Sequence, residues 1–196
     1  MINLSNFNFI LPEFILFISS IIILIFGAFS KSKSYLNINI LTLFSILFAI
    51  IGLFFLNDNS SIANNSFVNS LLSKYVKLFI LIIAFLAIYI SSNYVEKNQL
   101  NVFEYPVLLL FSILGMLVMV SSNDLIVLYI SIELQSLSLY VLVALRRGSI
   151  KASEAALKYF ILGSIASAVI LYGSSMIYSV SGTTNYELIK QFSDTT

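Results

Sequence analysis

The chain has 196 residues, of which 59% are hydrophobic and only 10% are charged, and its formal net charge is +1. A water-soluble domain carries about 25% charged residues, so this composition excludes a soluble fold. The balanced charge also lacks the basic excess typical of nucleic-acid-binding proteins, and no nucleic-acid partner is expected. The sequence therefore predicts an integral membrane protein.

Six apolar stretches follow one another along the chain, each about as long as a helix that crosses a bilayer. They cover residues 10–29, 38–56, 76–94, 106–121, 125–145 and 153–180. These runs are too long for barrel strands, and in lipid a helix satisfies its own backbone hydrogen bonds. We therefore expect a single all-α polytopic membrane domain with about six transmembrane helices, the longest loop at residues 57–73 and a polar tail after residue 182.

Lys and Arg are shared unevenly between the two sides that these spans define. The loops after the first, third and fifth spans contain Lys31, Lys33, Lys97, Arg146, Arg147 and Lys151, whereas the opposite side contains Lys74, Lys77 and Lys190. Because Lys and Arg are enriched in cytoplasmic loops, the first set is expected in the cytoplasm or matrix. The N-terminus then lies on the other side.

Glu133 lies eight residues into the fifth span, about 12 Å deep and near the middle of the hydrocarbon. An acid at the bilayer centre costs roughly 3 kcal/mol on insertion scales, so Glu133 should face protein or water rather than lipid. Ionisable groups inside a membrane are usually functional, and Glu133 is therefore a candidate proton-transfer residue. The structural alternative is a protonated or paired acid that only holds helices together.

Lys158 is a second candidate for proton transfer, about a turn and a half into the sixth span. It follows Glu154 by four residues, the spacing of a helical ion pair. One hypothesis makes Lys158 a cation that tunes the proton affinity of Glu133. The other is that its ammonium extends to the membrane surface beside Glu154. Three further acids near span ends are expected to be solvated or capping charges: Glu13, Glu104 and Asp124.

The chain contains no Cys and no His. Cys thiolates hold iron–sulfur clusters, and His is the usual protein ligand of haem and zinc. We therefore expect no cofactor and no metal site in this chain. The residue usage, rich in Ile, Phe, Asn, Ser and Lys, suggests an AT-rich genome. This favours the mitochondrial inner membrane, with a bacterial plasma membrane as the alternative.

Two stretches carry a resemblance to a known family. The run from Asn123 to Leu142, with Glu133 at its centre, resembles the fifth helix of the antiporter-like subunits of respiratory complex I. The stretch from Ser153 to Phe160 narrows the resemblance to the subunit N family of NADH-quinone oxidoreductase, called NADH dehydrogenase subunit 2 in mitochondria. Small-residue and terminal motifs agree with it: Gly163-Ser164, Ser167-Ala168, Leu171-Tyr172-Gly173 and Leu11-Pro12-Glu13. The resemblance is strong over residues 104–184 and loose before them.

The resemblance implies a part in proton translocation coupled to NADH:quinone oxidoreduction. Members of this family have about fourteen helices, with two inverted five-helix repeats that each form a half-channel for protons. Their fifth-helix glutamate, the position of Glu133, pairs with a lysine on the seventh helix, and lysines further along carry the proton path. This chain ends at Thr196, before a seventh helix, so it is expected to be a split-gene product or a fragment that cannot pump alone.

The same resemblance implies partners. We expect other membrane-arm subunits of complex I, a companion chain that supplies the later helices, and membrane lipids. FMN, iron–sulfur clusters and quinone are expected in other subunits, so the chain belongs to a proton-translocating NADH:ubiquinone reductase without redox chemistry of its own. Two alternatives stay open. A cation/proton antiporter complex shares the Glu133 helix, although residues 154–173 argue against it, and a purely structural membrane-arm piece fits the small residues of the sixth span.

Overall fold

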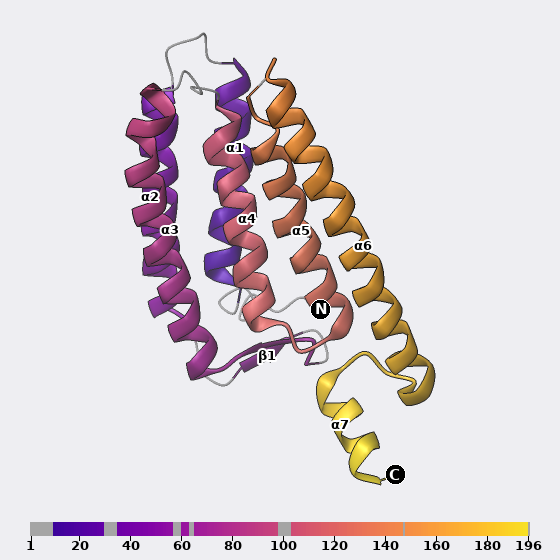
Figure 1. Cartoon of the computed structure of the whole chain (residues 1–196). Coiled ribbons are helices and arrows are strands. Elements are labelled where there is room, and N and C mark those ends of the chain that lie inside the picture. The colour runs from indigo at the N-terminus through magenta and orange to yellow at the C-terminus, as the bar shows by residue number, and fades with distance from the viewer. Residues whose placement is uncertain are drawn as a thin grey trace.

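The computed structural model describes residues 10–29, 35–56, 60–62, 65–97, 103–146 and 148–195. Six long helices within this part of the chain are apolar enough to cross a membrane. They are α1 (Leu11–Phe29), α2 (Tyr35–Phe54), α3 (Leu71–Lys97), α4 (Glu104–Ser121), α5 (Leu125–Val143) and α6 (Ile150–Ser181). Figure 1 shows them side by side, with chain direction alternating from one helix to the next. The all-α polytopic fold predicted from the sequence is confirmed.

Three elements differ from the expected pattern. The loop between the second and third spans contains an antiparallel hairpin of β1 (Ser60–Ile62) and β2 (Phe67–Asn69). Strands of three residues are too short for an alternating pattern to reveal them. The polar tail contains α7 (Tyr186–Thr195), a short amphipathic helix. Helix α3 begins at Leu71, well before residue 76, so that Lys77 lies inside the helix rather than near its edge.

The helix ends follow local signals. Asp124 is the N-cap of α5, where its side chain accepts hydrogen bonds from the backbone N–H groups of Ile126 at 2.8 Å and Val127 at 3.4 Å. The expectation that Asp124 is a capping charge is met. The hydroxyl of Ser149 caps α6 in the same way. Helix α6 ends at Gly182, whose φ of 67° is the left-handed conformation that glycine adopts without strain.

The apolar core lies among the first four helices. Its fully buried members include Leu16 of α1, Ile46 of α2, Leu81 of α3, and Leu110 and Leu117 of α4. Helix α4 contacts α1, α2, α3 and α5, whereas α6 packs on α5 at the outer edge of the bundle (Figure 1). Among the residues of α6 only Ala156 is buried, and among those of α5 only Ser131 and Ser138 are. The α5–α6 side is therefore open to lipid or to further helices.

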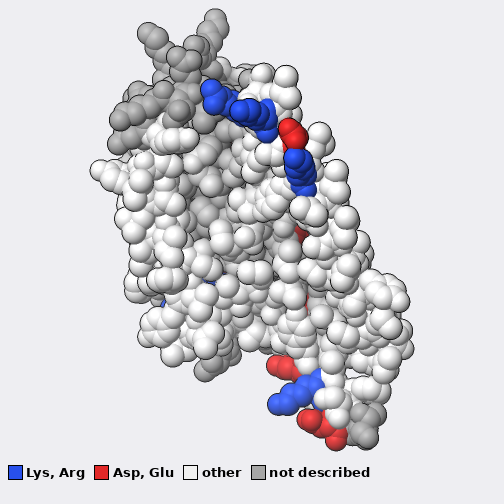
Figure 2. Space-filling model, viewed as in Figure 1, with Lys and Arg blue, Asp and Glu red and all other residues white. Residues whose placement is uncertain are grey.

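Charged residues gather at the two ends of the bundle, with a broad, mostly uncharged band between them (Figure 2). This is the distribution that a bilayer requires of a membrane-spanning protein. One end contains the connection between α5 and α6, with Arg146 and Lys151. The other contains the hairpin and α7, with Lys190. Arg146 and Lys151 therefore lie at the opposite end of the bundle from Lys190, as the distribution of Lys and Arg along the sequence predicted.

The membrane orientation leads to a labelling prediction. Single cysteines at Arg146 and at Lys190 are expected to react with an impermeant maleimide from opposite sides of the membrane. Arg146 should react from the cytoplasmic or matrix side, because that end carries the excess of Lys and Arg. The native chain provides a clean background since it contains no Cys. Labelling of both positions from the same side would contradict this topology.

Candidate functional site

Glu133 lies between α5 and α6, half-buried, and is bound by a residue of the neighbouring helix. The hydroxyl of Ser167 on α6 donates a hydrogen bond to Glu133 Oε1. The phenolic oxygen of Tyr129 lies 3.0 Å from the same Ser167 hydroxyl oxygen. Three polar groups thus form a bridge between the two helices, and the expectation that Glu133 faces protein is met on its α6 side.

The two polar faces of α5 have different roles. Tyr129 and Glu133 are four residues apart, so they share the face directed toward α6. Ser131 and Ser138 are buried on the opposite face, and their hydroxyls donate to carbonyl oxygens of α5 itself, Ser131 to Val127 and Ser138 to Leu134, both at 2.8 Å. Only the face toward α6 therefore carries a carboxyl group that is able to accept or release a proton.

Lys158 does not reach Glu133. Its ammonium nitrogen lies 2.6 Å from Glu154 Oε1, and the two side chains are 72% and 59% exposed. This is the helical ion pair that the four-residue spacing suggested. An exposed pair of this kind contributes only about 0–1 kcal/mol to stability. Within the part of the chain that the structure describes, no ion pair joins Glu133 to a Lys or Arg.

The expectation that Glu13 is a solvated or capping charge is wrong. Its side chain is only 3% exposed, and its Oε1 lies 2.6 Å from the ammonium nitrogen of Lys77, whose side chain is fully buried. Glu13 lies in the first turn of α1 and Lys77 nearly two turns inside α3, so the two side chains are buried although both lie toward the same ends of their helices. The signal in the sequence was a lone Lys with apolar neighbours on both sides, Val76 and Leu78. Glu104 lies in the first turn of α4 and is partly buried.

At the same end of the bundle, a polar network joins the hairpin, the α4–α5 turn and the α6–α7 loop. The backbone oxygen of Asn65 accepts hydrogen bonds from the side-chain amides of Asn123 at 2.8 Å and Asn185 at 3.2 Å. The hydroxyl of Thr184 donates to Asp124 Oδ2 at 2.6 Å. Partial burial, together with the negative charge of Asp124, raises the pKa of Tyr186 above its ordinary value. The start of the Glu133 helix is thus tied to the loop that follows α6.

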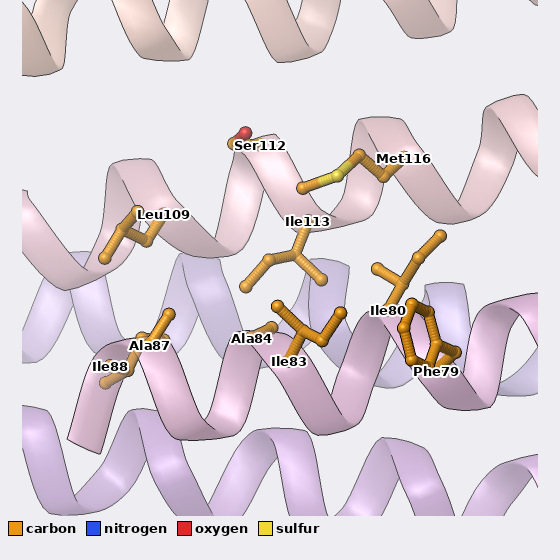
Figure 3. A pocket seen from close by; sticks show the side chains of 10 residues that line it. All are labelled: Phe79, Ile80, Ile83, Ala84, Ala87, Ile88, Leu109, Ser112, Ile113 and Met116. Carbon is orange, nitrogen blue, oxygen red and sulfur yellow. The ribbon is translucent and has the colours of Figure 1, made fainter. Parts of the chain in front are cut away.

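A groove between α3 and α4 is apolar and has no part in this chemistry (Figure 3). Its volume is about 280 Å³, and Ser112 is the single polar side chain among those that line it. The remaining lining residues are Phe79, Ile80, Ile83, Ala84, Ala87, Ile88, Leu109, Ile113 and Met116. No group in this set titrates, so the groove cannot hold or transfer a proton.

Comparison with known proteins places this geometry in context. Residues 122–196 match a family described as NADH:quinone oxidoreductase/Mrp antiporter, transmembrane region. The chain is 42% identical over 188 residues to NADH-quinone oxidoreductase subunit N of Pelagibacter ubique, covering 95% of this chain and 40% of that protein. It is 40% identical to the subunit N of Paramagnetospirillum magneticum, covering 91% of this chain and 37% of that one.

Solved structures agree with the sequence matches. A chain of respiratory complex I from Thermus thermophilus superposes with a TM-score of 0.72 at 26% identity, covering 91% of this chain and 41% of that one. A chain of an archaeal membrane-bound sulfane sulfur reductase shares the fold, with a TM-score of 0.70 at 22% identity.

The helical fold is similar to that of a chain of respiratory complex I, and most of α5, with Glu133, lies within the segment that matches the antiporter-like family. The chain belongs to the NADH-quinone oxidoreductase subunit N family, as its sequence resemblance implied. It spans about two fifths of the length of the curated relatives that it matches.

Proposed function

We propose that this chain forms part of the antiporter-like proton-translocating subunit in the membrane arm of complex I. The observation that carries the proposal is Glu133, a carboxyl group in the middle of a membrane span, held at a helix interface by Ser167. An acid at this depth costs free energy unless it faces protein or water, and acids placed in this way are usually functional. The relatives of this chain are named subunit N of an NADH-quinone oxidoreductase. In such a complex, an acid inside the membrane would transfer protons.

In the proposed mechanism, Glu133 alternates between carboxylate and neutral acid. A cation close to Glu133 favours the carboxylate, which then accepts the hydrogen bond of Ser167. When the cation moves away, the low dielectric favours the protonated form. The proton thus binds and leaves at the carboxyl oxygens, and no redox group in this chain takes part. Electron transfer is assigned to other subunits of the complex, since the chain has no Cys or His to ligate a cluster or a haem.

The cation is proposed to come from helices outside this chain segment. Lys158 is occupied by Glu154 at the exposed side of α6, so it does not act on Glu133 in this arrangement. The open sides of α5 and α6 leave room for further helices, and the chain spans only about two fifths of its relatives. Once such helices cover α6, Glu154 and Lys158 lie at a protein interface, where we propose that Lys158 passes protons onward.

The multi-pass membrane location follows from the six spans. The relatives named above are bacterial proteins, which favours a bacterial plasma membrane over the mitochondrial inner membrane that the residue usage suggested. A subunit of a cation/proton antiporter complex remains the second candidate, because the matching family includes such proteins. NADH dehydrogenase activity that co-purifies with this chain would support complex I, and its absence would support the antiporter complex.

Replacing Glu133 tests the proposal. Glu133→Gln keeps the shape and the hydrogen bond from Ser167 but removes titration. The complex is therefore expected to assemble normally, while proton uptake into reconstituted vesicles falls about a hundredfold or more, the range typical of a lost proton-transfer group. Glu133→Asp should retain part of the activity. Asp194→Asn, which removes an exposed acid from α7, is the matched control and should pump normally. Full pumping by assembled Glu133→Gln complex would refute the role of Glu133.

A further inference from the structure

Ser167 differs from other serines of α6 in the acceptor that its hydroxyl binds. Ser164 and Ser174 donate to carbonyl oxygens of α6 itself, three or four residues back. Ser167 instead donates across the helix interface to Glu133 Oε1, and its hydroxyl oxygen lies 3.0 Å from the phenolic oxygen of Tyr129. Its hydroxyl therefore connects an acid on α5 with a second hydroxyl group on the same helix.

The directions of the two hydrogen bonds in this bridge are linked. A serine hydroxyl has one hydrogen to donate and lone pairs with which to accept. While Ser167 donates to the Glu133 carboxylate, its contact with Tyr129 is a hydrogen bond only if the phenol donates. Both hydroxyl hydrogens then point toward the carboxylate, and each bond polarises and strengthens the next. When Glu133 is a neutral acid, its own O–H is able to donate to Ser167, and Ser167 then donates to Tyr129. The bridge therefore has two orders, one for each protonation state of the acid.

The bridge extends from Glu133 toward the hairpin end of the bundle. Tyr129 precedes Glu133 by four residues, about 6 Å along the axis of α5, on the side of the N-cap Asp124. Helical side chains lean toward the N-terminus of their helix, which for α5 lies at the hairpin end (Figure 1). Tyr129 is half-buried, so part of its side chain is accessible from outside the two helices. Three side-chain oxygens thus lead from the middle of the span toward that end.

We propose that Tyr129 and Ser167 form a proton wire that connects Glu133 with water at the hairpin end of the bundle. On release, the acid proton of Glu133 passes to the Ser167 oxygen, the earlier hydroxyl hydrogen of Ser167 passes to the Tyr129 oxygen, and the phenolic hydrogen passes to water. Each hydroxyl breaks one O–H bond and forms another, so both are neutral before and after, and water becomes hydronium. Uptake follows the same steps in reverse.

The wire is consistent with the charge rule that governs the acid. Release occurs when a cation approaches Glu133, because the cation favours the carboxylate. The hydroxyls are then left in the order that donates to the carboxylate, which is the order of the Ser167 hydrogen bond in the structure. This inference rests on the proposed function, since it supplies the path by which the translocating acid exchanges its proton.

Replacing Ser167 with two residues of nearly equal shape tests the wire. Threonine carries a hydroxyl where valine carries a methyl group. In the native complex, Ser167→Val is expected to slow NADH-driven proton uptake into vesicles about a hundredfold or more, as for a lost proton-transfer group, whereas Ser167→Thr should retain most of the rate. Ser164→Val is the control, because the Ser164 hydroxyl donates within α6, and it should pump normally.

Tyr129→Phe separates a wire from a group that only positions Glu133. The phenol binds Ser167 rather than the carboxyl group. Proton uptake should therefore fall about a hundredfold, while the C=O band of protonated Glu133 in infrared difference spectra shifts less than in Ser167→Val. The band is identified by its absence in Glu133→Gln. A shift as large as that in Ser167→Val would show that Tyr129 only positions the acid, and a wild-type rate would refute the wire.

The Ser167 variants decide independently. Wild-type pumping by assembled Ser167→Val, or equal losses in Ser167→Val and Ser167→Thr, would mean that the hydroxyl transfers no proton. If Ser167→Val does not assemble, Ser167→Ala replaces it, with the same expected loss and the same contrary result. Glu133→Gln complex in the same vesicles distinguishes the two proposals, since normal pumping there refutes the proposed function itself rather than the wire.

Discussion

Gly115→Leu is expected to separate α4 from α5 and to prevent the chain from reaching its folded state. A side-chain Cβ at Gly115 would lie 2.8 Å from the backbone oxygen of Ser131 and 2.9 Å from the backbone nitrogen of Gln135. These are backbone atoms of the facing helix, so no rotamer change relieves the clash. Small residues at such crossings let membrane helices approach closely. Even Gly115→Ala should cost about 1–3 kcal/mol, the usual range for an overpacked core.

The measurement is the amount of chain recovered from membranes and its thermal unfolding in detergent. Gly173→Ala is the matched control on α6, because a Cβ there meets no atom within 4 Å. Alanine favours a helix over glycine by roughly 0.5–1 kcal/mol, so the control should unfold at the same temperature or slightly higher. Equal stability of Gly115→Ala and Gly173→Ala would contradict the close approach of α4 and α5.

Asp124→Ala is expected to lower the free energy of unfolding by roughly 2–4 kcal/mol, combining a lost helix cap with a lost charged hydrogen bond. The substitution leaves the first N–H groups of α5 without the Asp124 carboxylate and removes the acceptor of the Thr184 hydroxyl. The α6–α7 loop then loses its side-chain hydrogen bond to the start of α5 and keeps only the backbone ones, Leu125 N–H to Thr184 and Tyr186 N–H to Asn123. Limited proteolysis should therefore cut this loop faster in the variant, and thermal unfolding should occur at a lower temperature.

Two variants separate the contributions at Asp124. Asp124→Asn keeps an acceptor oxygen for the N–H groups of Ile126 and Val127, so it should retain most of the stability. Thr184→Val removes only the hydrogen bond to the loop, and it should accelerate proteolysis without affecting α5. If Asp124→Ala is cut at the wild-type rate and unfolds at the wild-type temperature, the Asp124 side chain contributes nothing to the stability of the chain.

The spans were predictable because a bilayer imposes its thickness on the sequence, and runs of about 20 apolar residues have few other uses. The position of Glu133 in its span was predictable for the same reason. Its partner was not. The sequence places Ser136 and Tyr140 near Glu133 on one face of α5, but the hydrogen bond comes from Ser167 on another helix. Tyr140 instead packs against Gly163, with its ring 4.8 Å from that of Tyr159.

The buried pair of Glu13 and Lys77 shows where prediction from one sequence reaches its limit. Each charge, taken alone, lies near one end of its predicted span, 10–29 or 76–94, where an exposed charge is the ordinary interpretation. The pair costs little only because α1 and α3 bring the opposite charges together, and this contact depends on the tertiary fold. Lys158 raised the opposite problem. Its partner Glu154 was visible in the sequence, but the packing of α6 on α5, which decides whether Lys158 also reaches Glu133, was not.

The serines of α6 have a consequence for how the protein is made. Ser164, Ser174, Ser175, Ser179 and Ser181 donate their hydroxyl hydrogens to carbonyl oxygens of α6 itself, three or four residues back. A hydroxyl bound to its own helix exposes little unsatisfied polarity to lipid. These five serines therefore add little to the free-energy cost of placing newly synthesised α6 in the bilayer before any further helix packs on it.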